Sequence, residues 1–242
     1  MIKLTILIAA FFLFSHNTFV LAQEQSNFGL GFHGAPAAAI FYGVPTLQKD
    51  FDVQYQFKLG FIAGITIQYS LSPKFALNSE VNFESKGNRV LIPNLTDENG
   101  TFIGTGKEEL HADYLTVPMM VKYKFGQKKI KCFINAGPYL GYLLGFGWHV
   151  LPVGHFPGYK YEDDPDNYQR IDYGIVTGFG MNIPIKEQWL LSIEARNNLG
   201  LHKIIKGLSY KNEYSKNESV ALLIGLIYKF PSGQQVNKEN TK

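Results

Sequence analysis

Two charged residues of opposite sign, Glu194 and Arg196, stand inside the largely apolar stretch WLLSIEARNNLGL of residues 189–201. Charged side chains are almost never fully buried without a partner, so both groups need a polar surrounding. Their two-residue spacing places them on one face of an extended strand, where they can form ion pairs with each other or with other strands. The aliphatic residues between them then share the opposite face.

A second group of side chains suited to binding lies in the segment 147–169, which we expect to be a long loop. It offers aromatic and imidazole groups for a glycan or, preferably, a protein partner, namely Trp148, His149, His155, Phe156, Tyr159 and Tyr161. Asp164 and Asp166 have the spacing of two calcium ligands, but the glycine turn and distal Glu of an EF-hand do not follow. We therefore expect no metal and no cofactor, and a plain solvated loop is the alternative.

Three further residues, His111, His202 and Ser209, are of the types that a lipid hydrolase or an acyltransferase would use, and we expect them near one rim of the protein. No GxSxG or comparable arrangement surrounds them. Isolated His and Ser side chains in loops are usually polar surface. The sequence therefore predicts a protein that is not an enzyme, with a barrel enzyme acting on lipids as an alternative.

Strands must position these side chains, because apolar and polar residues alternate in eight runs. The runs cover residues 28–42, 56–71, 74–88, 112–125, 131–146, 170–184, 189–203 and 218–230. Each run has about 10 residues or more, the length that a tilted strand needs to cross a bilayer. No stretch after the N-terminal leader is long and apolar enough for a membrane-spanning helix.

The connections between these runs alternate between short and long. Turns near residues 72–73, 126–129 and 186–188 are short, whereas residues 44–55, 87–111, 147–169 and 204–217 form long connections. Short turns on one side and long loops on the other are typical of an outer-membrane barrel. The long loops would face outside the cell, and the N- and C-termini would be periplasmic.

The N-terminus has the pattern of a secretory signal peptide, predicted to cover residues 1–22. Lys3 precedes an apolar run over residues 4–14, and Val20-Leu21-Ala22 forms a small-residue cleavage context. The barrel domain is then expected over residues 23–230, followed by a polar periplasmic tail over residues 231–242. Removing the leader lowers the formal charge only from +3 to +2, which excludes the electrostatic footprint of a nucleic-acid-binding protein.

The interior of an eight-stranded barrel is only wide enough for side chains to fill it. We expect the charged face to point inward as a polar network, formed by Glu80, Glu84, Lys122, Asp172, Glu194 and Arg196, with Lys58 and Gln68 beside it. Glycines on the same face, such as Gly64 and Gly178, would make room for long side chains. A soluble lipocalin-like barrel would instead need an apolar interior and a polar exterior. With the faces assigned here, such a protein would expose a wide apolar band to water.

Four consecutive segments resemble the PorT-like outer membrane β-barrel family of Gram-negative bacteria. They are DYLTVPMMVKYKFG (113–126), NAGPYLGYLLGF (135–146), IDYGIVTGFGM (171–181) and LSIEARNNLGL (191–201), and their order and spacing match over nearly the whole mature chain. The resemblance implies an eight-stranded barrel in the outer membrane and no catalytic residue. One branch of the family is linked to protein secretion and gliding, so an accessory of a secretion apparatus is an alternative function.

The sequence therefore predicts an all-β protein, an eight-stranded antiparallel up-and-down transmembrane β-barrel with a plugged polar lumen. We expect a monomer that acts in binding or envelope assembly. Its expected partners are outer-membrane lipid around the apolar face and a protein bound through the long loops, but no nucleic acid.

Overall fold

The computed structural model describes residues 27–42, 54–96, 99–126, 130–163, 168–204 and 216–231. Several predicted features lie outside the described residues, namely the signal peptide, Asp164, Asp166, Ser209 and the tail after residue 231. None of the described residues belongs to a helix long and apolar enough to cross a membrane.

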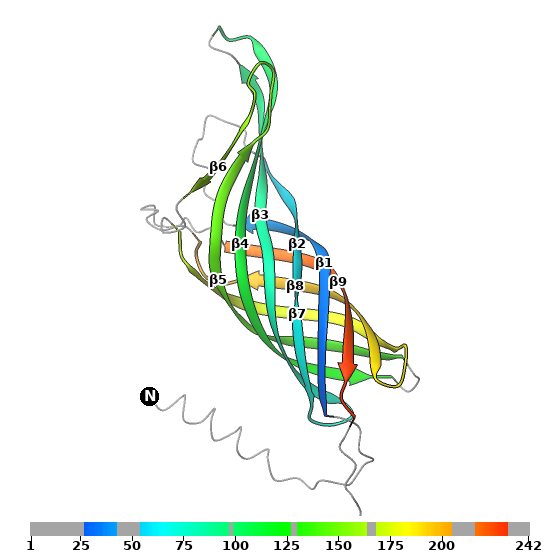
Figure 1. Cartoon of the computed structure of the whole chain (residues 1–242). Helices are drawn as coiled ribbons and strands as arrows, with labels where there is room; N and C mark the ends of the chain where they lie inside the picture. The colour runs from blue at the N-terminus through cyan, green and yellow to red at the C-terminus, as the bar shows by residue number, and fades with distance from the viewer. Residues whose placement is uncertain are drawn as a thin grey trace, which may run out of the picture. The chain divides into compact units, whose positions relative to one another are not determined.

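The described residues form nine strands. These are β1 (Phe28–Tyr42), β2 (Gln54–Ser70), β3 (Phe75–Thr96), β4 (Phe102–Phe125), β5 (Lys131–Val150), β6 (Tyr159–Asp163), β7 (Ile171–Pro184), β8 (Trp189–Gly200) and β9 (Lys216–Lys229). Eight of them pair with their neighbours in an antiparallel ring, in which β9 pairs back to β1 and β5 bridges β4 and β7 (Figure 1). The short β6 pairs with the end of β5. The predicted all-β, eight-stranded up-and-down barrel is confirmed.

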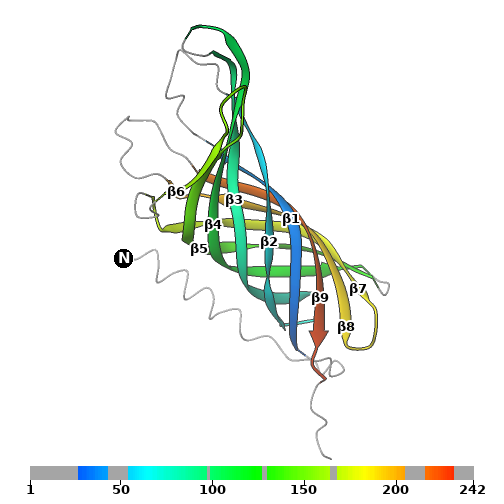
Figure 2. The same cartoon turned by 45° about the horizontal axis from the view of Figure 1, so that its top comes forward.

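The two ends of the barrel differ. The tight turns at residues 71–74 and 185–188 lie at one end, where Phe230 also bonds to Phe28 and so joins the two ends of the described chain. At the opposite end, here called the mouth, β3 and β4 continue past the ring together with β5 and β6 (Figures 1 and 2). We call this extension the projecting sheet; it comprises residues 91–96, 102–109 and 147–163, which include the turn between β5 and β6.

The prediction that residues 87–111 and 147–169 are long loops is therefore wrong in part. β3 has 22 residues and β4 has 24, and their pairing continues through Arg89–Glu109 to Thr96–Phe102. Charged residues such as Lys107, Glu108 and Glu109 mask the strand pattern in the sequence. Beyond the apolar band both faces of a strand can meet water, so charges there do not end the strand.

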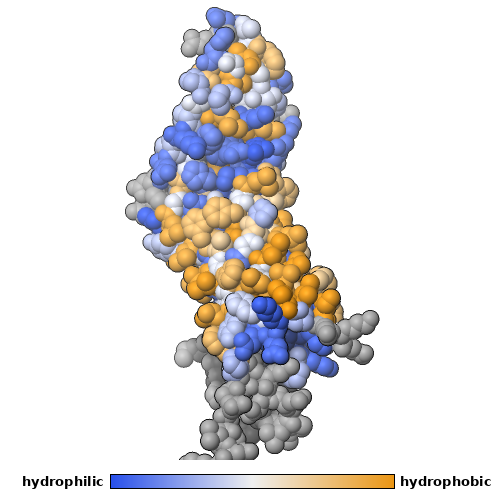
Figure 3. All heavy atoms as spheres, turned by 45° about the vertical axis from the view of Figure 1, so that its right-hand side comes forward, coloured by the Kyte–Doolittle hydropathy of each residue, from blue (hydrophilic) through white to orange (hydrophobic). Residues whose placement is uncertain are grey.

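The outer surface of the ring carries the apolar face of the strands. On β4, Leu115, Val117, Met119 and Val121 are exposed, while the alternating residues point inward and are buried. Figure 3 shows the resulting apolar band on one face of the barrel and a belt of hydrophilic residues above it. The band is the surface that the sequence assigns to lipid.

Candidate functional site: a closed lumen below a projecting sheet

Arg196 on β8 lies at the centre of a buried ion cluster in the lumen. Its guanidinium donates two hydrogen bonds to Glu80 of β3, across the barrel, with Nη2 2.9 Å from Oε1. Its Nε donates to Glu194 at 2.7 Å. Asn82 donates to Glu80 at 3.0 Å and lies 2.9 Å from the Nε2 of His33. The bidentate geometry and the near-complete exclusion of solvent make this a strongly coupled pair.

The barrel backbone is shaped to admit this cluster. Gly178 on β7 faces the lumen opposite Arg196 in the strand register. A Cβ at this position would lie 2.5 Å from Oε1 of Glu194 and 2.3 Å from Oδ1 of Asn135. The glycine therefore leaves the space that the Glu194 carboxylate occupies.

A second buried cluster lies one layer closer to the mouth, around Lys86 of β3. Its ammonium is 3.1 Å from Glu84 and 3.6 Å from Asp172. Asn198 donates to the Glu84 carboxylate at 2.8 Å, and Tyr139 donates to Asp172 at 3.0 Å. Glu84 and Asp172 were predicted inside, but Lys86 was not. The signal was available, because Lys86 follows Glu84 by two residues and so shares its face.

Two of the predicted lumen residues form no ion pair with either cluster, although one of them, Lys122, lines the void beside Arg196. Lys122 faces the lumen, but within the described residues it forms no ion pair, and its Nζ lies 4.0 Å from the centre of the Phe133 ring. Lys58 was predicted inside, yet it lies over Gly87 on the outer face. The cause is an irregularity between Phe57 and Ile62, where the β2–β3 register shifts and the alternation of faces is reset.

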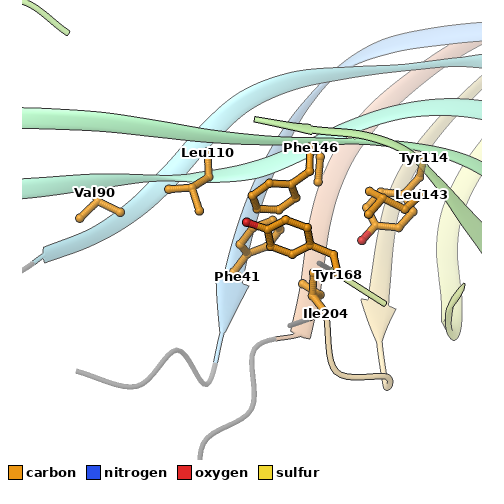
Figure 4. Packing of buried hydrophobic residues seen from close by; sticks show 9 residues of the cluster. Phe41, Val90, Leu110, Tyr114, Leu143, Phe146, Tyr168 and Ile204 are labelled. Atoms are coloured by element: carbon orange, nitrogen blue, oxygen red, sulfur yellow. The ribbon is translucent and has the colours of Figure 1, made fainter. Parts of the chain in front are cut away.

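An apolar plug closes the lumen at the mouth. It is a cluster of buried residues from β1, β3, β4, β5 and two connections: Phe41, Val90, Leu110, Ala112, Tyr114, Leu143, Phe146, Tyr168 and Ile204 (Figure 4). The Phe146 ring stacks on Tyr168 with centroids 3.7 Å apart and lies 6.4 Å from Phe41. This plug was not predicted. The inward parity of Leu110, Ala112 and Tyr114 signals part of it.

Tyr168 belongs to both the plug and the connection that follows β6. Its hydroxyl donates a hydrogen bond to Asp163 at 2.8 Å, and the next residue, Gln169, bonds to the carbonyl of Ile204. Burial and the bond to Asp163 raise the pKa of the Tyr168 hydroxyl well above its usual range. The hydroxyl therefore remains a donor at any physiological pH, and the connection stays tied across the mouth.

The five predicted loop-binding residues divide between different places on the projecting sheet. Trp148 lies opposite Tyr161 in the β5–β6 register, and Tyr159 lies one row farther out on the same inner face. His149 points to the outer face, and His155 is exposed in the turn between β5 and β6. The structure thus brings three of the five side chains onto one surface above the plug.

The two described residues that were considered for catalysis, His111 and His202, are not brought together. His111 lies on the outer face of β4, whereas His202 follows β8, bonds to the carbonyl of Ile171 and packs on Tyr173. Over the part of the chain that is described, no three His, Cys, Asp or Glu side chains converge in a way that could hold a metal ion.

The closed antiparallel ring with an apolar exterior and an ionic interior agrees with a comparison of the chain with protein families. Residues 21–206 match the model of the family described as outer membrane protein beta-barrel domain, which is more than half of the chain. The chain belongs to this family. Membership places the protein in the outer membrane, with the apolar band against lipid. No curated protein matches the chain significantly.

Several solved structures are similar to this outer membrane β-barrel protein. Neisserial surface protein A is 16% identical with a TM-score of 0.46, and the match covers 86% of this chain and 100% of that chain. OprG from Pseudomonas aeruginosa is 10% identical with a TM-score of 0.47, over 86% and 98% of the two chains. Outer Membrane Protein W of E. coli is 14% identical with a TM-score of 0.39, over 86% and 100%. At these identities the comparison carries no information on function.

The lipid-facing side of the barrel can be tested at Ala195, which lies midway along β8 beside Phe179 and Leu222 in the strand register. Ala195→Arg is expected to lower the free energy of unfolding by about 2–4 kcal/mol, because the charge would face hydrocarbon near the midplane. The matched control is Leu201→Arg, at the mouth end of the same face, with an expected cost of about 0–1 kcal/mol. Denaturant unfolding in lipid vesicles measures both. Equal costs would contradict the assignment of this face.

Proposed function

We propose that this protein is a non-enzymatic, monomeric outer-membrane barrel that acts by binding a protein partner through its projecting sheet. The observation that carries the proposal is a contrast between the two parts of the molecule. The lumen is occupied by two ion clusters and an apolar plug, and the void beside Arg196 measures only about 20 Å³. That volume holds roughly one water molecule, so the void beside Arg196 is too small to admit a solute.

The projecting sheet has the composition of a binding surface. Phe102, Phe156, Tyr159 and Tyr161 are all exposed on it, although aromatic side chains of this size are usually buried. Aromatic residues are enriched where proteins bind each other, because they bury a large area with little loss of rotamer entropy. Trp148, which is partly buried against the plug, links this surface to the rigid barrel.

The mouth is proposed to face outside the cell, with both termini in the periplasm. Outer-membrane barrels carry short turns on the periplasmic side and long connections on the outer side. The turns at 71–74 and 185–188 lie at the end opposite the projecting sheet. Within the family, the four segments 113–126, 135–146, 171–181 and 191–201 favour the PorT-like branch.

Shortening the projecting sheet tests this function. Ile92 and Gly106 pair directly, so residues 93–105 can be replaced by the two-residue turn Asn-Gly without a change of register. The shortened protein also carries Tyr159→Ser and Tyr161→Ser, because these two exposed aromatic side chains lie on β6, outside the replaced segment. We expect the shortened protein to fold and insert, as shown by a heat-dependent shift in gel migration, because the plug and ion clusters remain. In a deletion strain it should fail to restore envelope integrity or protein secretion where the full chain restores them.

Restoration by the shortened chain would show that the projecting sheet is not the functional surface. If the variant no longer inserts into the membrane, the barrel needs the projecting sheet for folding. That result would contradict the proposal. The defect that appears in the deletion strain also separates the two finer roles. Loss of secreted proteins alone would indicate an accessory of a secretion apparatus, whereas leakage of the envelope would indicate a role in its assembly.

A further inference from the structure

A polar pocket of about 280 Å³ lies on the outer face of the barrel, at the base of the projecting sheet. Its lining includes Lys58, Glu109, His111, Asp113, His149 and Lys160, which come from β2, β4, β5 and β6. It lies outside the lumen, and on the projecting sheet it occupies the face opposite to that of Trp148, Tyr159 and Tyr161. Side chains that are far apart in the sequence converge here because the strands pair in one continuous sheet.

The strand register explains why these groups share one face. Glu109 lies opposite His149 on β5, and His149 in turn lies opposite Lys160 on β6. His111 and Asp113 follow Glu109 at two-residue intervals and so point the same way. The hollow between them arises from β5, which presents Gly145 and Gly147 at these rows; a Cβ on Gly147 would lie 2.6 Å from the His111 ring.

The order of the outward-facing residues along β4 gives the depth of the pocket relative to the membrane. Val121, Met119, Val117 and Leu115 are exposed apolar residues, and the next outward residue is Asp113. Each two-residue step advances about 6.6 Å along a strand. The headgroup region is about 5–7 Å thick on each side of the hydrocarbon. The pocket therefore begins at the edge of the apolar band and spans the headgroup layer.

The charges in the pocket are only partly satisfied. Glu109 is bound by Arg89, whose Nε lies 2.9 Å from its Oε1. Glu109 and Asp113 line the pocket together with Lys58 and attract it, but among the described residues neither Lys58 nor Lys160 forms a direct ion pair. The Oδ1 of Asp113 is buried and accepts no hydrogen bond. A complementary ligand must therefore supply an anionic group for two ammonium groups and an N–H or O–H donor for the carboxylate.

We infer that this pocket binds the headgroup of a phosphorylated glycolipid in the membrane leaflet around the mouth. A phosphate supplies the anion, and the sugar hydroxyls or amides supply the donors that Asp113 lacks. The acyl chains would lie along the apolar band directly below. Basic pockets at membrane interfaces bind anionic headgroups in this way. The inference rests on the outward orientation proposed above, but not on the partner that the projecting sheet binds.

Lipid retention by the purified barrel tests the inference. The full chain, refolded in phosphatidylcholine nanodiscs that contain diphosphorylated lipid A, should retain one lipid A molecule on transfer to detergent, as measured by native mass spectrometry. The double variant Lys58→Gln/Lys160→Gln should bind roughly thirtyfold more weakly, as for the loss of two basic contacts to an anionic headgroup. Both lysines are on the surface, so heat-dependent gel migration should show normal folding.

The matched control is Lys203→Gln, which removes an exposed lysine that follows β8 at the same end of the barrel but lies outside the pocket. It should leave retention unchanged. If the control loses as much lipid A as the double variant, binding depends on the overall positive charge of the surface, and the proposed site is wrong. Equal retention of lipid A from which both phosphates have been removed would also overturn it. If free glucosamine phosphate binds the pocket with the same dissociation constant as lipid A, the ligand is a soluble sugar phosphate and not a lipid.

Discussion

Arg196→Ala is expected to lower the free energy of unfolding of the barrel by about 3–5 kcal/mol, as for other buried ion pairs that lose one partner. The substitution removes both hydrogen bonds to Glu80 and the bond to Glu194. Two carboxylates would then remain in the lumen, with Asn82 and His33 beside Glu80 and with the Lys122 side chain lining the same void. Denaturant unfolding in detergent micelles, followed by tryptophan fluorescence, measures the loss.

The outer face offers a matched control for this substitution. Arg89 also pairs with a carboxylate, that of Glu109, but its side chain is 39% exposed. Surface ion pairs contribute about 0–1 kcal/mol, so Arg89→Ala should cost no more than that. If the two arginines cost the same, the lumen is hydrated and the Arg196 cluster is not desolvated. Arg196→Met does not serve as a test, because apolar replacement of a buried ion pair can be neutral.

Phe146→Ala should remove about 3–5 kcal/mol of stability, the usual cost of deleting a buried aromatic side chain. The ring stacks on Tyr168 and packs near Phe41, and so joins β1, β5 and the connection before β7. The control is Phe156→Ala in the turn between β5 and β6. Its side chain is 60% exposed, so we expect a change within about 0.5 kcal/mol.

The same pair of variants tests how the lumen is closed. Both ion clusters lie below the plug and remain in Phe146→Ala, so planar-bilayer recordings should show no stable conductance steps for this variant or for the unmodified protein. Conductance in the unmodified protein would contradict the closed lumen. Conductance only in Phe146→Ala would assign closure to the plug alone and leave the ion clusters a purely stabilising role.

Alternation along single strands was sufficient to predict the ring and much of the ion clusters. The expected run 189–203 corresponds to β8 at Trp189–Gly200. Its parity puts Glu194 and Arg196 on one face, and the expected eight-stranded barrel assigns that face to the lumen. That Arg196 reaches Glu80 depends on the opposite placement of β3 and β8, which follows from the count of eight strands. These features are local, or follow from closure of the ring.

Features that depend on exceptions to the alternation could not be predicted. Lys58 has the spacing of a lumen residue, but the irregularity before Ile62 turns it outward. Tyr168 and Ile204 come from connections with no repeating pattern, and only the folded mouth brings them to Phe146. The continuation of β3 to Thr96 was hidden because charged residues in a water-exposed strand have the composition of a loop.

Closure of the ring also sets the order in which the chain can fold. β1 pairs with β9, so Gly29 finds its partner at Lys229, at the opposite end of the folded chain. Pairings of such long sequence separation form slowly, because the loop-closure entropy is lost before the contact forms. Until β9 has been synthesised and folded, one edge of β1 has no partner strand, and Phe41 cannot pack against the other residues of the plug. The apolar plug therefore forms late in assembly. Until β9 pairs with β1, the ring is open and the plug does not close the lumen.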